Sequence, residues 1–264
     1  YAYLLGLSVG DGDCTDEGSL KICVCEDEMK TIVQDLFLRL FREKGKVYGH
    51  WAYIGGVELR AYLKNLGLDY SKSYEKTIPS AIFNSSKKNC AAFLQGLFDT
   101  DGSIRMDGRN KNTKRIHLAT TSKQLADRTQ LLLLNFGIIS VIQKIKAGKI
   151  PAYIKGRQIH SKHDRYDLTI KGNKSVKLFL EDIGFGLSRK QKILEGASTE
   201  KYNLLTVPNQ RNRIIGLYKK LPLKEQQRDK VRIARFTRSS NGKATKELTY
   251  AKLGKFIETY EDFF

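Results

Sequence analysis

Residues 4–12 read Leu-Leu-Gly-Leu-Ser-Val-Gly-Asp-Gly, and residues 94–102 read Leu-Gln-Gly-Leu-Phe-Asp-Thr-Asp-Gly. Both stretches follow the pattern L-x-G-L-x-x-x-D-G, and the second begins 90 positions after the first. With average amino-acid usage, five such matches arise by chance in about one window in 10⁵. The chain therefore contains an internal repeat, and this repeat decides the fold.

The segments that follow each motif are alike and predict a common structural unit. A period-two alternation, typical of a half-buried strand, comes first, and a helical periodicity comes next. More strand-like sequence follows, and each copy closes with a short helix that ends in a glycine. We predict an α+β fold built from tandem αββαββα repeats. The strands are expected at 19–25, 47–53, 115–121, 138–145 and 165–170, and the helices at 3–10, 29–41, 59–67, 90–100, 123–136 and 175–184.

The repeat also predicts the domain organisation. The first repeat spans residues 1–89, and the second spans residues 90–195 with longer, basic hairpins. A small helical module occupies residues 196–264, with helices expected over 208–220, 223–236 and 250–260; its segment 245–257 has the length of a helix-turn-helix element. We interpret the module as an extra DNA-binding element, or as a packing extension that supports the second repeat.

The charge of the chain is uneven. Among 264 residues there are 47 Lys plus Arg and 28 Asp plus Glu, which gives a net charge of +19. Residues 1–100 hold 12 basic and 13 acidic residues, residues 101–195 hold 20 and 8, and residues 196–264 hold 15 and 7. A localised excess of this kind indicates contact with a polyanion. The alternative is an ordinary solvated, lysine-rich surface that binds nothing specific.

Composition excludes other classes of protein. No apolar run approaches the roughly 20 residues of a membrane span, and no long basic amphipathic helix is expected, so we predict no membrane partner. Four cysteines in this length do not form a disulfide framework, which favours a reducing compartment. We expect an intracellular protein of the cytoplasm, the nucleoid or an organelle with its own DNA.

Small residues lie four apart within each motif: Gly6 and Gly10 in the first, Gly96 and Thr100 in the second. Small residues at this spacing let two helix backbones approach closely, so we expect the two motif helices to pack together. We also expect each helix to end at the motif's last glycine in a left-handed cap. That arrangement brings Asp11 and Asp101 to adjacent helix C-termini.

A carboxylate at a helix C-terminus faces the negative end of the helix dipole, at a cost of about 0.3–1 kcal/mol. Two such carboxylates also repel each other. A divalent cation removes both penalties, and hard oxygen ligands suit Mg²⁺. We predict a metal site formed by Asp11 and Asp101 with backbone carbonyls at Gly10 and Thr100. The alternative is that each Asp only satisfies a local turn through its side chain.

These motifs, the repeat and the charge resemble the LAGLIDADG homing endonucleases of the monomeric two-repeat type. The phrases Lys76-Thr77-Ile78-Pro79 and Phe98-Asp99-Thr100-Asp101-Gly102-Ser103 are similar to the endonuclease domain of inteins. The resemblance covers residues 1–195. It implies two saddle-shaped antiparallel sheets on a long, asymmetric double-stranded DNA target. It also implies a pseudo-two-fold monomer and Mg²⁺-dependent cleavage across the minor groove, with Mn²⁺ as a substitute.

The resemblance also assigns residues. Asp11 and Asp101 match the acidic metal-ligand positions, and Lys76 matches a lysine beside the scissile phosphate, where a cation stabilises developing charge. In the second repeat Lys190 is the best counterpart, with Lys192 as the runner-up. The first motif departs from the usual pattern at Ser8-Val9, and Thr100 stands where the first motif has Gly10, but neither change removes a ligand.

Strand alternation predicts part of the DNA-facing set, Lys21, Cys23, Cys25, Arg115, His117 and Thr121, because a two-stranded ribbon fits the major groove and alternate side chains point to one face. The other members are basic residues of the extended hairpins and later strands of the second repeat. Leu20, Ile22 and Val24 are expected to face the core, as are Ile116 and Leu118. The predicted DNA-contacting set comprises Lys21, Cys23, Cys25, Arg105, Arg109, Lys111, Lys114, Arg115, His117, Thr121, Lys144, Lys146, Lys149, Lys155, Arg157, Lys162, Arg165 and Lys171.

The leading hypothesis is thus a site-specific, metal-dependent double-strand DNA endonuclease. A second hypothesis is a nucleic-acid-binding protein of the same fold that does not cleave, such as an intron RNA maturase or a DNA-binding regulator. Loss of a motif aspartate would favour the second hypothesis, but both Asp11 and Asp101 are present.

Overall fold

The structure is a computed structural model in which the chain forms two units, Tyr1–Thr199 and Glu200–Phe264. Each unit is described by itself. The described residues are 1–14, 19–68, 72–107, 110–148, 152–154, 157–159, 161–170, 172–196, 206–207, 210–224, 248–249 and 254–258.

The first repeat has the predicted order of elements. They are α1 (Ala2–Asp11), β1 (Gly12–Cys14), β2 (Ser19–Cys23), α2 (Asp27–Phe41), β3 (Lys46–Tyr48), β4 (Trp51–Gly55) and α3 (Val57–Asn65). The strands form an antiparallel sheet in the order β1-β2-β4-β3. The first copy of the αββαββα unit is therefore confirmed.

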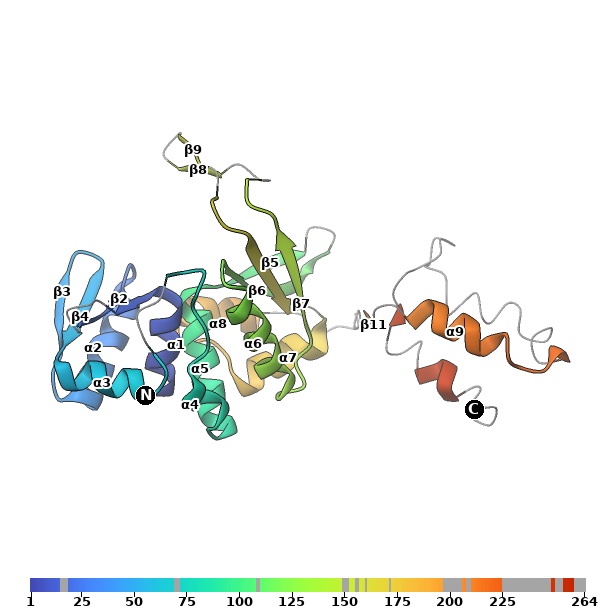
Figure 1. The fold of residues 1–264 in the computed structure, drawn as a ribbon, viewed down its shortest axis with the longest axis horizontal. Coiled ribbons are helices and arrows are strands. Elements are labelled where there is room, and N and C mark those ends of the chain that lie inside the picture. Colours follow the sequence, from blue (N-terminus) through green and yellow to red (C-terminus); the bar gives the residue numbers. More distant parts are fainter. Residues whose placement is uncertain are drawn as a thin grey trace. The chain divides into compact units, whose positions relative to one another are not determined.

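The second repeat copies this order. Helix α4 (Ser80–Phe83) precedes α5 (Lys87–Thr100), β5 (Gly102–Asp107), β6 (Asn110–Thr120), α6 (Lys123–Leu134), β7 (Ser140–Ile145), β10 (Arg165–Ile170) and α7 (Asn173–Asp182), and α8 (Ser188–Glu195) follows. The antiparallel sheet has the order β5-β6-β10-β7. A separate ribbon of β8 (Ala152–Ile154) and β9 (Arg157–Ile159) lies in the chain between β7 and β10 (Figure 1).

Alternation decides which face of each sheet is buried. Leu20, Ile22 and Val24 are buried in the first repeat, and Ile116 and Leu118 are fully buried in the second, as predicted. Across the second sheet Ile116 lies opposite Ile170, and Leu118 lies opposite Leu168. Because successive side chains of a strand point to opposite faces, the intervening residues are left on the other face of the sheet.

The two motif helices, α1 and α5, pack side by side at the junction of the repeats (Figure 1). A Cβ atom at Gly6 would lie 2.1 Å from the Phe93 carbonyl oxygen, and one at Gly96 would lie 2.3 Å from the Tyr3 carbonyl oxygen. Only glycine fits where two backbones are this close. The predicted close packing of the motif helices is confirmed.

The predicted left-handed caps are wrong. Gly12 has φ −94° and ψ 160°, an extended conformation, and Gly102 is the first residue of β5. Each helix passes directly into a strand, so the glycine Cα is pressed against its own helix. A Cβ atom at Gly12 would lie 2.3 Å from the Ser8 carbonyl oxygen, and one at Gly102 would lie 2.3 Å from that of Phe98. The motif glycines provide space at this turn, not a positive φ.

The C-terminal unit contains helix α9 (Gln210–Tyr218) and a two-stranded sheet of β11 (Thr206–Val207) and β12 (Leu248–Thr249). Its small core comprises Ile214, Tyr218, Leu221 and Phe256. Residues 254–258, within the helix expected over 250–260, are helical; in the segment 245–257, which has the length of a helix-turn-helix element, residues 248–249 are a strand. The helix expected over 223–236 lies almost wholly outside the described residues. Among the described helices, none has the length and apolar character of a membrane span.

Candidate active site

Asp11 and Asp101 lie at the ends of the two packed motif helices. Asp11 is the last residue of α1 and is exposed, whereas Asp101 follows the last residue of α5 and is partly buried. Burial and the charge of Asp11 raise the pKa of Asp101 to about 6, and the positive charges of Lys76 and Lys190 oppose this rise. Two carboxylates and two ammonium groups therefore act on one another at the junction of the repeats.

Lys76 reaches the C-terminal end of α1. Its Nζ donates hydrogen bonds to the carbonyl oxygens of Gly10 at 2.6 Å and Gly12 at 3.2 Å. The last carbonyl groups of a helix have no partner within the helix, and a cation there is favourable. The lysine thus satisfies carbonyl groups that flank Asp11.

Lys190 makes the equivalent contacts at the end of α5. Its Nζ donates to the carbonyl oxygens of Asp99 at 2.6 Å, Gly102 at 2.6 Å and Phe98 at 3.1 Å, and lies 3.5 Å from that of Thr100. The side chain is buried, and burial lowers its pKa. Lys192, the other candidate, is exposed. Lys190 is therefore the spatial counterpart of Lys76.

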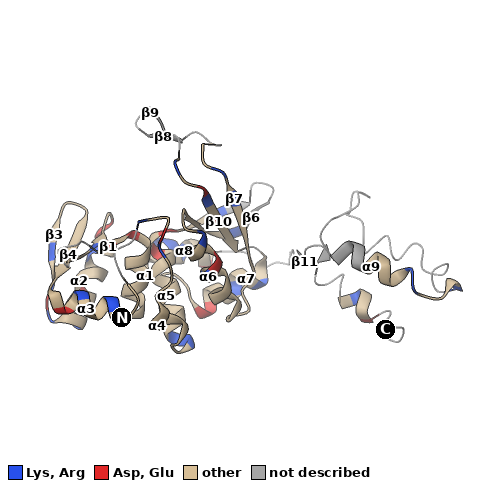
Figure 2. Ribbon diagram, in the orientation of Figure 1, with Lys and Arg blue, Asp and Glu red and all other residues tan. Residues whose placement is uncertain are grey.

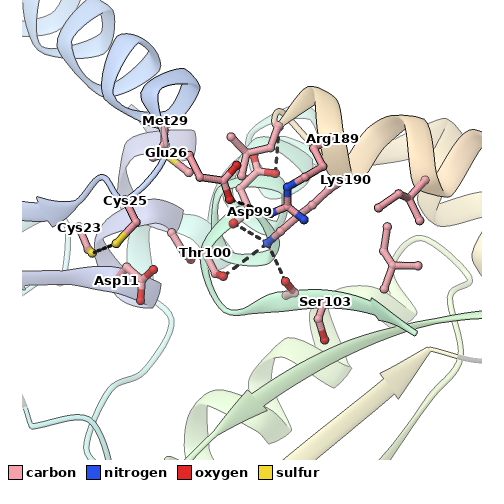
Figure 3. A pocket seen from close by; sticks show the side chains of 14 residues that line it. Asp11, Cys23, Cys25, Glu26, Met29, Asp99, Thr100, Ser103, Arg189 and Lys190 are labelled. Atoms are coloured by element: carbon pink, nitrogen blue, oxygen red, sulfur yellow. Dashed lines mark hydrogen bonds and ion pairs between the residues drawn. The ribbon is translucent and has the colours of Figure 1, made fainter. Parts of the chain in front are cut away.

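An open pocket of about 370 Å³ lies beside these groups (Figure 3). Its lining combines Asp11, Cys23 and Cys25 of the first repeat with Thr100 and Lys190 of the second. The two cysteine sulfurs are 3.2 Å apart, and burial and the neighbouring Cys25 raise the pKa of the Cys23 thiol to about 11. The predicted DNA-facing cysteines thus border the same pocket as Asp11.

Sequence reasoning missed Asp99, a buried carboxylate in the lining of the pocket. It accepts a hydrogen bond from the Tyr3 hydroxyl at 2.6 Å and from the backbone N–H of Gly186 at 2.9 Å and of Leu187 at 3.3 Å. These bonds join α1, α5 and the segment that leads into α8. The signal was available: Asp99 stands where the first motif has the apolar Val9.

The outward face of the second sheet carries the core of the predicted DNA-contacting set. Arg105 is exposed and lies opposite the half-buried Arg115 across β5 and β6, and Ser103 lies opposite His117. The His117 Nδ1 is 3.1 Å from the Thr169 hydroxyl. Burial and the charges of Arg105 and Arg115 lower the pKa of His117. Figure 2 shows basic residues recurring on strands of this sheet.

Other predicted contacts are placed elsewhere. Lys114 shares the alternation of the buried Ile116, and its ammonium group donates to the Ile193 carbonyl in α8. Lys144 points to the same face of β7 as the inward-facing Ile142, and its ammonium group pairs with the Asp164 carboxylate at 2.7 Å. Alternation therefore assigns both lysines to the helix-covered side of the sheet, not the outward face. The Thr121 hydroxyl, predicted to face outward, is buried with no hydrogen-bond partner among the described residues.

The remaining predicted residues divide into three groups. Lys21 pairs with Asp13 at 2.8 Å, and Arg165 pairs with Asp167 at 2.8 Å. Lys146 and Lys162 are exposed. Arg109, Lys149, Lys155 and Lys171 lie outside the described residues, as do the side chains of Lys111 and Arg157.

The residues present suit a divalent cation. Within the part of the chain that the structure describes, no group of three or more His, Cys, Asp or Glu side chains could enclose an ion. Burial and, after it, the charge of Asp11 raise the pKa of Asp101, and a hard cation between the two carboxylates would relieve the repulsion between them. Both predicted carbonyl ligands already accept a bond from a lysine: that of Gly10 from Lys76 at 2.6 Å and that of Thr100 from Lys190 at 3.5 Å.

Comparison with known proteins bears on this geometry. The profile of the LAGLIDADG-like domain matches residues 88–184, which span α5 to α7. Over these residues the chain is similar to a LAGLIDADG-like domain. The two four-stranded antiparallel sheets and the doubled αββαββα order agree with the fold predicted from the resemblance.

Two proteins and one solved structure illustrate what this chain is similar to. The replicative DNA helicase DnaB of Synechocystis sp. is 32% identical over 138 residues, which cover 52% of this chain and 15% of that protein. The glutamine–fructose-6-phosphate aminotransferase of Methanocaldococcus jannaschii is 27% identical over 202 residues, or 73% of this chain and 17% of that protein. A structure of variants of the homing endonuclease I-DmoI has a TM-score of 0.48 and 19% identity, covering 74% of this chain and 95% of that chain.

Proposed function

We propose that the protein is a site-specific double-strand DNA endonuclease. The observation that carries the proposal is the meeting of Asp11 and Asp101 at the ends of two touching helices, where burial and the charge of Asp11 disfavour the ionised form of Asp101. Asp11 and Asp101 would hold Mg²⁺, or Mn²⁺ in its place. When bound, such an ion supplies charge stabilisation to the attacking and leaving oxygens of phosphodiester hydrolysis.

Lys76 and Lys190 have matched tasks in this proposal. Each ammonium group is held by backbone carbonyls at the end of one motif helix, next to one aspartate. A fixed cation beside a scissile phosphate stabilises the charge that develops during cleavage and needs no rearrangement at that moment. Two such lysines suit two cuts, one in each strand across the minor groove.

The proposed partner is a long double-stranded DNA, bound by a monomer with approximate two-fold symmetry. Arg105, Arg115 and His117 share the outward face of the second sheet, and side chains of these types read base edges in the major groove. The net charge of +12 on residues 101–195 (20 basic less 8 acidic) supports a grip in which the second repeat provides most phosphate contacts.

The relatives support a mobile origin for the chain. It matches 15% of a DNA helicase and 17% of an aminotransferase, proteins that share no activity by name. A segment common to small parts of such different proteins is what an insertion into host proteins produces. We infer that the chain derives from an element of the intein type, whose endonuclease acts on the site of insertion.

The test is selection of cleaved sites from a randomised duplex library in Mg²⁺, followed by cleavage of a supercoiled plasmid that carries the selected site. We expect double-strand cutting in Mg²⁺ and Mn²⁺, and none by Asp101→Asn. The exposed Asp35→Asn, on α2, is the matched control and should cut normally. DNA or RNA binding without cutting in either metal would instead support the maturase or regulator hypothesis.

A further inference from the structure

Lys76 and Lys190 lie on segments that are each held by hydrogen bonds with the other repeat. Lys190 belongs to α8, the last helix of the second repeat, and Lys76 belongs to the segment between α3 and α4, in the last part of the first repeat. Neither lysine sits on the helix whose end it contacts. What fixes these two segments therefore decides whether each ammonium group is in place.

The start of α8 is held by the first repeat. The Glu28 carboxylate, in the first turn of α2, accepts hydrogen bonds from the Ser188 N–H at 3.0 Å and from the Ser188 hydroxyl at 2.5 Å. One residue on, Arg189 pairs with Glu26 at 2.7 Å. The first N–H groups of a helix lack partners within the helix, and a carboxylate there is favourable. The next residue of α8 is Lys190.

The segment that carries Lys76 is held by the second repeat. The Ser122 hydroxyl, at the N-terminus of α6, donates to the Lys76 carbonyl oxygen at 2.6 Å. Further along α6, the Arg128 guanidinium donates to the Thr77 hydroxyl at 3.0 Å and to the Ile78 carbonyl at 3.4 Å. The side chain of Ile78 is fully buried, which fixes the same segment from the other side.

We propose that each active-site lysine is positioned by the opposite repeat. Glu28 of the first repeat positions Lys190 at the end of α5, and Arg128 of the second repeat positions Lys76 at the end of α1. This inference rests on the proposed endonuclease function. Glu28 and Arg128 are positioning residues, since they touch the lysine-bearing segments and not the reacting groups. These contacts between the repeats, from Glu28 to α8 and from Arg128 to the Lys76 segment, form a cross-brace. Because of it, the position of each lysine depends on correct docking of the two repeats.

The first test resolves the two strands of the cleaved duplex. With the selected site labelled on either strand, Glu28→Ala should slow the cut made with Lys190, and Arg128→Met should slow the other cut. Removing a supporting interaction of this kind costs about tenfold to a hundredfold in rate. Each variant should accumulate nicked duplex, in opposite strands. The exposed Asp35→Ala in α2 and Lys123→Met in α6 are matched controls and should leave the two rates equal.

A merely structural role predicts a different result. If both variants slow both strands equally, or slow the same strand, the cross-brace is refuted while the endonuclease function stands. If the unaltered protein cuts nothing, the proposed function is refuted, and a second measurement still decides the brace. In DNA-free protein, NMR of lysine side-chain ¹⁵N groups should show a hydrogen-bonded, exchange-protected Lys190 ammonium that loses protection in Glu28→Ala but not in Arg128→Met. An unchanged Lys190 signal in Glu28→Ala refutes the inference.

Discussion

Replacing Asp101 with Asn should stabilise the metal-free protein while it abolishes cutting. Asp101 is an ionised carboxylate near neutral pH, and burial together with the charge of Asp11 disfavours that ionised form in the folded state. Asn has the same shape without the charge. Residues that serve a site at the expense of stability behave in this way.

The size and sign of the change in stability follow from the pKa of Asp101, which is raised from its ordinary value of 3.8 to about 6. At about 1.4 kcal/mol per pKa unit, this difference corresponds to about 3 kcal/mol as an upper limit. Below pH 3.8 the folded and unfolded states both bind the proton, so Asp101 makes no pH-dependent contribution to the free energy of unfolding. As the pH rises from 3.8 to 6, the unfolded state releases the proton while the folded state still holds it, so the free energy of unfolding falls. Asp101→Asn should therefore raise the free energy of unfolding at pH 7.5 but not at pH 3.5.

Urea unfolding in EDTA at these two pH values measures the effect, with Asp35→Asn as the control. In the unaltered protein, added Mg²⁺ should recover stability, because an ion that binds only the folded state stabilises it; in Asp101→Asn it should recover much less. The reasoning is refuted if Asp101→Asn is less stable than the unaltered protein at pH 7.5. That outcome would mean that the Asp101 carboxylate holds the turn between α5 and β5.

Three further predictions concern other parts of the chain. Gly6→Ala should lower the free energy of unfolding by about 1–3 kcal/mol, because its Cβ would meet the backbone of α5, and thermal unfolding should show no such loss for Gly216→Ala, which has open space around it. Cys23, with a pKa raised from 9.0 to about 11, should have a thiolate fraction about a hundredfold below an ordinary thiol at pH 8; rapid alkylation of Cys23 in a mass-mapped reaction would contradict this. Neutralising Arg105 and Arg115 together should reduce the salt slope of DNA binding by about 0.9 for each phosphate that an arginine no longer neutralises, and an unchanged slope would show that neither arginine touches the backbone.

The motif and its repetition were enough to predict the order of elements and the packing of the motif helices. Both are local properties: alternation and helical periodicity report burial, and glycine at a fixed spacing reports close approach. The sequence also predicted a lysine at each motif. It ranked Lys190 above Lys192 but left Lys192 open, because the choice depends on which face of α8 meets the end of α5.

The errors have physical causes of the same kind. Lys114 and Lys144 were counted with the outward-facing residues because they are basic, yet alternation along their strands assigns them to the other side. The caps at Gly12 and Gly102 were predicted because a glycine ends each motif helix, whereas the helix-to-strand turn needs only a missing Cβ. The hydrogen bonds between Glu28 and Ser188, 160 positions apart, have no local signature at all.

The ammonium groups of Lys76 and Lys190 have a consequence for the order in which the site is assembled. Each is a permanent counter-ion that belongs to the chain, and both oppose the rise in the pKa of Asp101. The repulsion at the junction is therefore partly offset before any ion from solution arrives. We therefore expect the protein to fold with its two repeats docked before metal binds, so that metal binding is a late event, separable from folding.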